Sequence, residues 1–444
     1  MELKRFKDII AFKNKDGVHS DDTIIAFHAT NLEVAELSEE SFNEMTSIGL
    51  ESGEIPDEKP NVDEEANSAL AEWNSEKNPD ARSGKLEFGI RSITINVNQI
   101  CNLKCSYCAA GGDGTYGEPT NQISIEKSLP QLKFFLASLK SGSKFSITFV
   151  GGEPLIHPTA IKAIYEYVVN EAKELNVIPN FTIVTNGTLL TGNTAEIVRA
   201  MKVHITVSID GTKDANDLLR PTKNGTSSTD LTLAGIEEIS KNRGSILSFG
   251  IAAVFANGNE DLVRNYSFFK ALSPDWIEFN FAYSEGSKEL QLKYLSQMSK
   301  IAKIAWTNGG EQELRKIRLF DHYFKMLDAQ QLIENHCGAG KTYLMVDAKN
   351  KLYTCPWEVG KKDELVGQNE LLDHGKLAKY SKSLIELNNC QSCWARHLCG
   401  GGCMYIHKAH TGDKHKKDNL FCERTRSLIL DTLLYYKRAR SANV

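Results

Sequence analysis

Three cysteines close together in the sequence are the side chains best suited to hold an inorganic centre. Cys101, Cys105 and Cys108 have the spacing C-x3-C-x2-C and follow the alternating apolar run 93–98. Three thiolates on one loop can wrap around one centre, but a structural zinc site requires four protein ligands. A [4Fe–4S] cluster held by three thiolates leaves one iron open to an external ligand. The spacing therefore favours an open cluster over a zinc site that borrows a distant fourth ligand.

The other seven cysteines all lie in the last quarter of the chain. They are Cys337, Cys355, Cys390, Cys393, Cys399, Cys403 and Cys422. Clustered thiols with short gaps indicate metal or cluster ligands. Two zinc knuckles are an alternative because C-x2-C is a common zinc spacing, but they would leave an odd number of thiols.

The composition limits the class of protein. The chain has 444 residues, of which 41% are apolar and 25% charged, with a net charge of −5. The length predicts two to four domains, and the charge gives no reason to expect nucleic acid or a membrane surface as partner. No apolar run is long enough to span a bilayer. The first residues lack the apolar stretch of a signal peptide, and the thiols are expected to be reduced, so we expect a cytoplasmic protein.

Between residues 88 and 310 apolar runs alternate with helical patterns, which is typical of an α/β fold. Helices are expected over 125–139, 160–175, 229–241 and 261–272, and strands over 91–97, 145–150, 180–184, 204–209, 246–255 and 276–281. Such β–α units require a parallel sheet with right-handed crossovers. Eight units would close a barrel, so six predict a partial (β/α)6 TIM-like barrel. Ligands bind at the carboxyl ends of such strands, where the first cysteine loop lies.

Further short motifs follow the predicted strands. Gly151, Gly152 and Glu153 follow the second strand, Asn186 lies in a Thr-Asn-Gly-Thr segment after the third, and Ser208 ends the fourth, with Arg220 beyond it. Paired glycines allow a ligand to approach the backbone. Ser208 can bond a ribose hydroxyl and Arg220 can pair with a carboxylate. Each motif alone fits a tight turn or a surface arginine, but their order after the cysteine loop favours one common site.

This series resembles the radical S-adenosylmethionine (radical SAM) domain of peptide- and protein-modifying enzymes, over about residues 88–310. The resemblance implies that Cys101, Cys105 and Cys108 hold a [4Fe–4S] cluster whose open iron takes the amino and carboxylate groups of SAM. The other cofactor contacts that it implies are Gly151, Gly152 and Glu153 at the methionine amine, Ser208 at the ribose, Arg220 at the carboxylate, Tyr107 on the adenine side, and Asn186.

The later cysteines resemble the SPASM extension, which carries auxiliary [4Fe–4S] clusters. The resemblance implies one cluster on Cys390, Cys393, Cys399 and Cys422, and another on Cys337, Cys355 and Cys403, which makes three clusters in all. Two fully ligated auxiliary clusters need eight thiols, whereas this region offers seven. Asp347 and His336 are candidate fourth ligands, but a turn aspartate and a hydrogen-bonded histidine are simpler interpretations. We therefore expect an open iron at which a substrate cysteine could dock.

The N-terminal region is expected to be a small α+β unit. Strands are predicted over 9–12, 23–28 and 31–37, and a helix over 39–45. The layout resembles winged-helix elements that bind leader peptides as an added strand, with 9–12 and 23–28 as the candidate edge. The predicted divisions are the recognition unit 1–50, an acidic linker 51–87 with a possible helix, the radical SAM barrel 88–310, a bridging region 311–332 and the SPASM region 333–444.

Together these features predict a radical SAM oxidoreductase that matures a ribosomally made peptide (a RiPP maturase). A 5′-deoxyadenosyl radical would install a thioether or carbon–carbon cross-link in a precursor peptide that carries a leader. An electron donor such as flavodoxin or ferredoxin would supply the reducing equivalent. Formylglycine formation of the sulfatase-maturase type and peptide epimerisation are alternatives within the family. A non-catalytic iron–sulfur or zinc scaffold is the alternative from another class.

Overall fold

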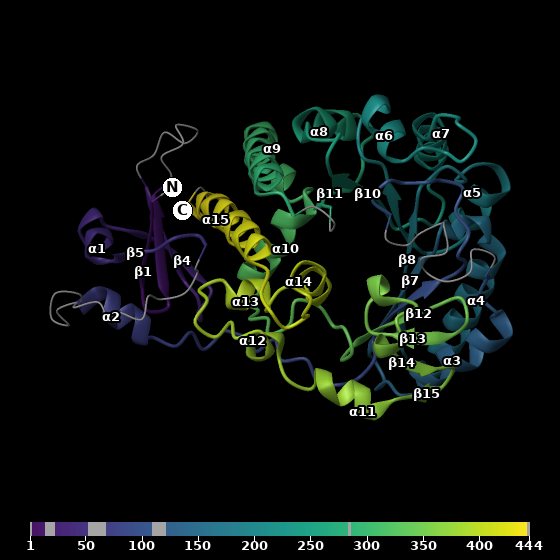
Figure 1. Cartoon of the computed structure of the whole chain (residues 1–444), viewed down its shortest axis with the longest axis horizontal. Helices are drawn as coiled ribbons and strands as arrows, with labels where there is room; N and C mark the ends of the chain where they lie inside the picture. The colour runs from purple at the N-terminus through teal and green to yellow at the C-terminus, as the bar shows by residue number, and fades with distance from the viewer. Residues whose placement is uncertain (1, 14–22, 52–67, 109–120, 283–285, 442–444) are drawn as a thin grey trace. The chain divides into compact units, whose positions relative to one another are not determined.

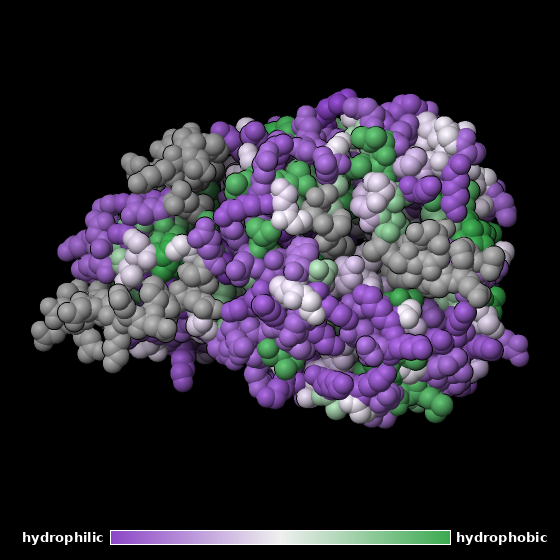
Figure 2. All heavy atoms as spheres, in the orientation of Figure 1, coloured by the Kyte–Doolittle hydropathy of each residue, from purple (hydrophilic) through white to green (hydrophobic). Residues whose placement is uncertain are grey.

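The computed structural model describes residues 2–13, 23–51, 68–108, 121–282 and 286–441 (Figure 1). The chain forms two compact units. Unit 1 comprises residues 1–86, 286–337 and 382–444, and unit 2 comprises residues 87–285 and 338–381. Within the described ranges no helix is both long and apolar enough to cross a membrane. On the face shown in Figure 2, hydrophilic side chains predominate and apolar ones are scattered.

Unit 2 is built on a parallel sheet whose first six strands follow one another in sequence order. These strands are β6 (Ser92–Asn96), β7 (Lys144–Val150), β8 (Ile178–Thr185), β9 (His204–Ser208), β10 (Ser248–Phe255) and β11 (Trp276–Phe281). All six predicted strands are thus confirmed. The order among the described residues is β11-β10-β9-β8-β7-β6, which is that of a partial barrel.

Helices connect these strands as right-handed crossovers require. They are α3 (Ile125–Ala137), α4 (Pro158–Glu174), α5 (Gly192–Arg199), α6 (Lys213–Leu219), α7 (Ser228–Lys241) and α8 (Leu262–Ala271). The predicted helices correspond to α3, α4, α7 and α8. The short helices α5 and α6 were not predicted.

The two faces of the parallel sheet differ in chemistry because side chains alternate along a strand. In β7, Phe145, Ile147 and Phe149 are fully buried, whereas Ser146 and Thr148 are half-buried. The same alternation runs through β8 and β11. The large apolar side chains on one face form a buried core. The smaller or polar side chains lie on the other face, where a cavity can form.

Residues 338–381 extend this sheet on the other side of β6. Strand β12 (Tyr343–Val346) pairs in parallel with β6, with Tyr343 opposite Ser92. The sheet continues through the antiparallel strands β13 (Lys351–Tyr353), β14 (Leu365–Gln368) and β15 (Leu371–Leu372), followed by α11 (His374–Leu377). These strands were not predicted. They are short, and the partner of β12 lies about 250 residues earlier in the chain.

Unit 1 contains an antiparallel sheet at the start of the chain. Its strands are β1 (Glu2–Phe6), β2 (Ile9–Lys13), β3 (Ile24–His28), β4 (Glu33–Leu37) and β5 (Thr46–Ser47), and α1 (Glu39–Glu44) precedes β5. The predicted strands and helix correspond to β2, β3, β4 and α1, whereas β1 and β5 were missed. This part is α+β, as expected. Its helical share within the described residues is limited to α1 and α2 (Ser68–Ser75), so sheet predominates more than in a winged helix.

Strand order corrects the predicted position of the free edge. Among the described residues the order is β4-β3-β2-β1-β5. The segments 9–12 and 23–28, proposed as the edge, are β2 and β3, and each is paired on both sides. Strands β4 and β5 form the two edges, and β5 has only two residues.

Both faces of this N-terminal sheet are covered. On one face Ile9, Ala11 and Ala26 pack with Phe42 of α1 and Leu70 of α2. On the other face Ile10, Phe12 and Phe27 share a core with the C-terminal part of unit 1. The segment predicted as a separate unit, 1–50, is therefore continuous with C-terminal helices in one core.

The remaining helices of unit 1 come from the second half of the chain. They are α9 (Lys288–Leu314), α10 (Arg318–Asp328), α12 (Leu384–Leu387), α13 (Arg396–Cys399), α14 (Met404–Thr411) and α15 (Asn419–Ser441). Helix α9 is interrupted at Gly309 and Gly310, whose backbone is not helical. Helix α15 supplies Ile429, Leu430 and Leu433 to the core beneath the N-terminal sheet.

Candidate functional site

Unit 2 contains a cavity of about 430 Å³ at the carboxyl ends of its parallel strands. Every residue predicted for the first cluster and for the cofactor lines this cavity: Cys101, Cys105, Tyr107, Cys108, Gly151, Gly152, Glu153, Asn186, Ser208 and Arg220. They come from five segments of the chain that the sheet topology brings to one edge. The structure therefore gathers the predicted motifs into one place, as expected for the carboxyl edge of a parallel sheet.

The cysteine loop is held by its neighbours on both sides. The Asn98 side chain accepts a hydrogen bond from Ile100 N (2.9 Å), which turns the chain after β6. Lys104 N donates to Pro221 O (2.8 Å) and Ser106 N donates to Leu219 O (2.9 Å). The loop is thus attached to the segment that follows α6, which includes Arg220.

Gly152 is required where the backbone of the next strand end meets the cysteine loop. Gly152 N donates to Asn98 O (2.8 Å) and Glu153 N donates to Ile100 O (2.7 Å). A Cβ atom at Gly152 would lie 2.2 Å from Ile100 O and 2.8 Å from Cys101 N. The sequence predicted that these glycines allow a ligand to approach. The structure adds that Gly152 allows the cysteine loop itself to approach.

Glu153 has an internal role in addition to lining the cavity. Its carboxylate is 1% exposed and accepts hydrogen bonds from Leu155 N (3.0 Å), Thr185 Oγ1 (2.6 Å) and Asn186 N (2.7 Å). Burial raises the pKa of Glu153, and these hydrogen bonds partly offset that rise. The carboxylate therefore fixes the end of β8 against the glycine turn.

Asn186 reaches the first cysteine of the loop. Its amide Nδ2 donates to Asn102 Oδ1 (2.9 Å) and lies 4.0 Å from Cys101 Sγ. Asn102 in turn donates to Thr188 Oγ1 (2.7 Å). This amide and hydroxyl network holds the Cys101 side of the loop, and the predicted site residue Asn186 is its centre.

Tyr107, Asp210 and Arg220 hold the Cys105 side. The Tyr107 hydroxyl donates to Asp210 Oδ2 (2.5 Å) and accepts from Arg220 Nη1 (2.6 Å). Burial raises the pKa of Tyr107 and of Asp210, while the nearby Arg220 charge acts to lower both. Asp210 is 0% exposed and was not predicted as a site residue, because in the sequence it looks like a turn residue after β9.

Other lining residues were also missed. They are polar or aromatic side chains on β6, on β11 and after Cys355: Thr94, Glu278, Asn280 and Trp357. The signal that could have found Glu278 and Asn280 is their alternation with the buried residues of β11. Trp357 lies shortly after Cys355 and beyond all six parallel strands in the sequence, so no strand-end pattern indicates it.

The thiols of this cavity fit the ligand set of an open [4Fe–4S] cluster. Cys101, Cys105 and Cys108 lie on one loop, and the cavity beside them has room for a further ligand. Burial raises the pKa of Cys101 to about 12 and raises that of Cys105, where the Arg220 charge opposes the rise. Among the described residues no group of three or more His, Cys, Asp or Glu is arranged to hold a single metal ion.

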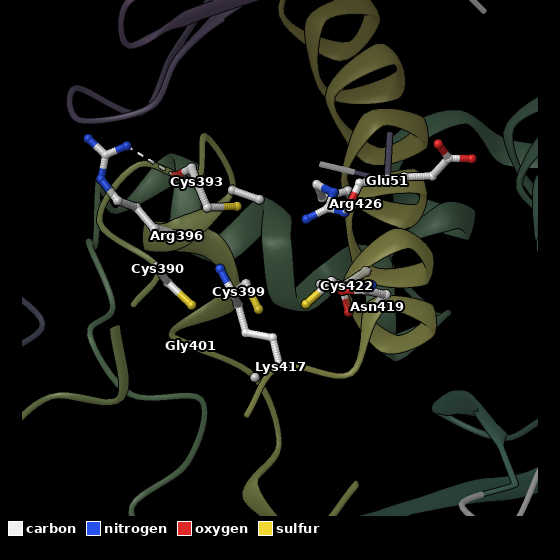
Figure 3. Close-up of a pocket in the computed structure, with 13 residues that line it drawn as sticks. Glu51, Cys390, Cys393, Arg396, Cys399, Gly401, Lys417, Asn419, Cys422 and Arg426 are labelled. Atoms are coloured by element: carbon white, nitrogen blue, oxygen red, sulfur yellow. Dashed lines mark hydrogen bonds between the residues drawn. The ribbon is translucent and has the colours of Figure 1, made fainter. Parts of the chain in front are cut away.

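Unit 1 contains a second cysteine-lined cavity, of about 300 Å³ (Figure 3). Its lining includes the four cysteines predicted for one auxiliary cluster: Cys390, Cys393, Cys399 and Cys422. The first three come from the loop before and within α13, and Cys422 comes from α15. The cationic side chains Arg396, Lys417 and Arg426 also line it.

Burial dominates the chemistry of these thiols. It raises the pKa of Cys399, and the neighbouring Cys422, Cys393 and Cys390 raise it further. Burial also raises the pKa of Cys422 to about 11, while Arg426 and Lys417 act to lower it. A thiol must lose its proton to ligate iron, so these groups need a cationic centre to become thiolates.

The third predicted set, Cys337, Cys355 and Cys403, is not among the residues that line either cavity. Cys337 and Cys403 belong to unit 1, and Cys355 belongs to unit 2. Asp347 accepts hydrogen bonds from Lys349 N (2.9 Å) and Lys351 N (2.8 Å), as a turn residue does. His336 Nδ1 contacts Cys399 O (3.1 Å). This cluster stays a prediction.

Comparison with known proteins assigns part of the chain to a family. Residues 95–268 match the radical SAM superfamily. The radical SAM cyclopropyl synthase TigE of Paramaledivibacter caminithermalis is 24% identical over 378 residues, which is 78% of this chain and 75% of TigE.

Two solved structures share the fold. The structure of anSMEcpe with bound AdoMet has a TM-score of 0.64 and 19% identity, and the match covers 80% of this chain and 95% of that one. SuiB of Streptococcus suis bound to its precursor peptide SuiA has a TM-score of 0.51 and 16% identity, and the match covers 95% of this chain and 100% of SuiB. Residues 95–268 therefore match the radical SAM superfamily, and the chain shares its fold with these two solved structures.

Proposed function

We propose that this protein is a radical SAM peptide maturase that installs an intramolecular cross-link in a ribosomally made precursor. The observation that carries the proposal is the unit 2 cavity, where the three-cysteine loop, the glycine turn, Ser208 and Arg220 line one space. The domain match over 95–268 and the similarity to TigE support it. When bound, the cluster and SAM would supply a 5′-deoxyadenosyl radical able to take hydrogen from an unactivated carbon.

The residues of the cavity would bind and orient SAM. Cys101, Cys105 and Cys108 would hold the cluster, and the backbone at Gly151 and Gly152 would receive the methionine amine. Ser208 would bond the ribose and Arg220 the carboxylate. Glu153 would act mainly by holding the end of β8, since its carboxylate is occupied by internal donors.

Two auxiliary [4Fe–4S] clusters complete the proposal. Cys390, Cys393, Cys399 and Cys422 would fully ligate one, as their shared cavity supports. Cys337, Cys355 and Cys403 would hold the other and leave one iron open. A substrate cysteine docked on that iron would lead to a thioether, whereas the name of TigE, a cyclopropyl synthase, favours a carbon–carbon bond. A flavodoxin or ferredoxin would donate electrons, and the reduced thiols suit the cytoplasm.

The N-terminal sheet would bind the leader of the precursor. Strand β4 (Glu33–Leu37) is the longer of the two edge strands of the sheet, with no further strand on its outer side among the described residues. An edge strand offers unpaired backbone groups to an added strand. Val34 and Leu37 extend the two buried cores of this sheet to the edge, so an added strand would meet apolar side chains there.

Hydrogen exchange would test this part of the proposal. We expect a synthetic leader peptide to slow amide exchange across residues 33–37. The short edge strand β15 (Leu371–Leu372) at the end of the unit 2 sheet serves as the control and should be unaffected. Equal protection of both segments, or protection of neither, would contradict leader binding at β4.

The central experiment is to measure iron, sulfide and zinc per chain after anaerobic reconstitution, followed by a SAM cleavage assay. Three cubes require about twelve iron and twelve sulfide per chain. About four iron would leave the C-terminal thiols without clusters, and no iron with no 5′-deoxyadenosine would support a scaffold instead of an enzyme.

Mass spectrometry of the precursor would then separate the reactions. A cross-link removes two hydrogens from the peptide, and the two linked segments stay attached to each other when the peptide is fragmented. Formylglycine changes a single serine or cysteine, and epimerisation leaves the mass unchanged. Formylglycine is the second candidate because the cysteine-type anaerobic sulfatase-maturating enzyme of Clostridium novyi is 24% identical to this chain over 358 residues.

A further inference from the structure

Asp210 is a buried carboxylate that the cofactor assignment leaves without a role. It follows β9, and hydrogen bonds fix it through both backbone and side chain. Asp210 N donates to Asn216 Oδ1 (2.9 Å), and Asp210 O accepts from Asn259 Nδ2 (2.7 Å). Its carboxylate Oδ1 accepts from Val254 N (2.9 Å). One carboxylate oxygen therefore anchors the side chain to β10, and Oδ2 is directed to Tyr107.

The Tyr107 hydroxyl connects this anchor to Arg220. A guanidinium can only donate hydrogen bonds, so the hydroxyl must accept from Arg220 Nη1 and give its own proton to Asp210. The two bonds measure 2.6 Å and 2.5 Å. The direct distance from Arg220 Nη1 to Asp210 Oδ1 is 3.9 Å, which is too long for a hydrogen bond. Tyr107 is thus the link between the two charged groups.

Arg220 combines burial with access to the cavity. The residue is 8% exposed and lines the cavity beside Ser208 and Cys105. The contact to Tyr107 uses one terminal nitrogen of its planar fork, and the other nitrogens remain to bind an anion. A guanidinium group that is already fixed at one nitrogen loses little conformational entropy when its other nitrogens bind a carboxylate.

The same connection reaches the cysteine loop. Leu219 and Pro221, on either side of Arg220, accept hydrogen bonds from Ser106 N and Lys104 N. Cys105 lies between these two donors in the sequence. The backbone that carries Arg220 and the loop that carries Cys105 are therefore fixed to each other, and Tyr107 joins their side chains.

We propose that Asp210 and Tyr107 are positioning residues that hold the Arg220 guanidinium in place to bind the carboxylate of SAM. The inference rests on the proposed function, since it assumes that SAM occupies this cavity. It changes the role expected for Tyr107, whose hydroxyl acts through Arg220 in addition to any contact of its ring with the adenine. The network predicts a preference for ligands that carry the carboxylate.

Binding of two matched ligands tests this role without measuring turnover. SAM and decarboxylated SAM differ only in the carboxylate, and both are titrated into anaerobically reconstituted protein. Tyr107→Phe keeps the ring and removes the link. We expect its affinity for SAM to fall about tenfold, the scale of one hydrogen bond to a charged group. Its affinity for decarboxylated SAM should stay within about twofold of that of the parent, because this ligand has no carboxylate for Arg220 to bind.

Two further variants keep the test informative. Asp210→Asn should also reduce the preference for SAM. An asparagine side chain has one acceptor oxygen and one donor NH2 group, so its NH2 group must face either Val254 N, which is itself a donor, or the Tyr107 hydroxyl, which already accepts from Arg220. Tyr165→Phe removes a phenol hydroxyl that accepts from Lys202 N in the same unit and does not line the cavity, so it should leave both affinities unchanged. Iron content and thermal unfolding confirm that each variant is folded and loaded.

The outcomes separate the inference from the proposed function. If the parent binds SAM and Tyr107→Phe retains the full preference for it, the positioning role is wrong. Equal weakening of both ligands would also overturn it, since the hydroxyl would then support the fold alone. If the loaded parent binds neither ligand, the proposed function fails, and this inference fails with it.

Discussion

The two cysteine-lined cavities of this protein differ in how their thiols are supplied. In unit 2, Cys101, Cys105 and Cys108 lie on one loop, and the ends of several strands supply the rest of a cavity of about 430 Å³. In unit 1, the loop before α13, α13 itself and helix α15 together supply four cysteines to a cavity of about 300 Å³. Cationic residues line both cavities, but only the first is completed by residues at the ends of parallel strands.

This difference distinguishes a centre that can bind a reacting ligand from a centre whose ligand positions are all filled by the protein. Three thiols with additional space leave a position for a ligand, as in metal sites that catalyse reactions, whereas four thiols can complete a ligand set and exclude one. Arg220 in unit 2 is connected through Tyr107 to Asp210. In unit 1, Arg426 donates to the backbone oxygens of Leu50 and Glu51 and so braces the protein itself. We interpret the first cavity as built for a ligand and the second as built for a cluster alone.

The largest expected effect comes from removing one thiol from each cavity. Cys105→Ala should abolish SAM cleavage, because the first cluster would lose a ligand. Cys393→Ala should retain some cleavage and lose the peptide product. Both are measured by release of 5′-deoxyadenosine and by mass spectrometry of the precursor. Equal activity of either variant and the parent would contradict the division between the cavities.

The next effect tests whether the second cavity depends on the core of unit 1. Trp394 is fully buried between Cys393 and α13, in the core that includes Ile10 and Leu433. Trp394→Ala should destabilise unit 1 by about 3–5 kcal/mol, as expected for loss of a buried tryptophan. Chemical denaturation with an iron assay measures this loss. The half-buried Trp73 is the control, and an equal cost of Trp73→Ala would show that Trp394 has no special place in the core.

A smaller effect tests the approach of backbone to loop in unit 2. Gly152→Ala would place a methyl group 2.2 Å from Ile100 O, and overpacking of this kind costs about 1–3 kcal/mol. We expect weaker loading of the first cluster and weaker SAM binding, while the iron of the second cavity is retained. Gly89→Ala is the matched control in the same unit because nothing lies within 4 Å of its added Cβ. Normal loading of the Gly152 variant would refute the steric argument.

The smallest effect concerns the ion pair between the turn that joins β1 to β2 and helix α13 in unit 1. Arg396 Nη2 lies 2.7 Å from Asp8 Oδ1, with side-chain exposures of 9% and 35%. Partly exposed pairs contribute up to about 1 kcal/mol, so Asp8→Ala should lower the unfolding free energy by that amount or less. A double-mutant cycle with Arg396→Ala isolates the pair. A coupling energy of zero would show that the Asp8–Arg396 pair does not help to hold α13 against the sheet.

Local patterns predicted the strands of the barrel and the residues that meet at their ends. The six parallel strands carry alternating or continuous apolar residues, and the cysteine, glycine and arginine motifs follow them directly in the sequence. Parallel topology then brings the motifs together without any knowledge of distance. This is why Cys101, Gly152, Asn186 and Arg220 line one cavity, as the order of motifs predicted.

Long-range pairing could not be predicted in the same way. Strand β12 has four residues, and its partner β6 lies far away in the sequence, so nothing local indicates that it extends the sheet. The role of Asp210 depends on Tyr107, which is 103 residues earlier. The edge of the N-terminal sheet was assigned to 9–12 and 23–28 because β1 and β4 could not be ordered around them from pattern alone.

The composition of unit 1 has a consequence for how the protein is made. Leu3, Ile10, Phe12 and Phe27 are translated long before their partners Ile429, Leu430 and Leu433 in helix α15. A chain under synthesis must therefore carry this sheet with one apolar face uncovered until α15 has been made. Cys422 belongs to the same helix, so a cluster held by the four cysteines of the unit 1 cavity would be completed only after α15 has been synthesised, and the uncovered apolar face would be open to chaperones before then.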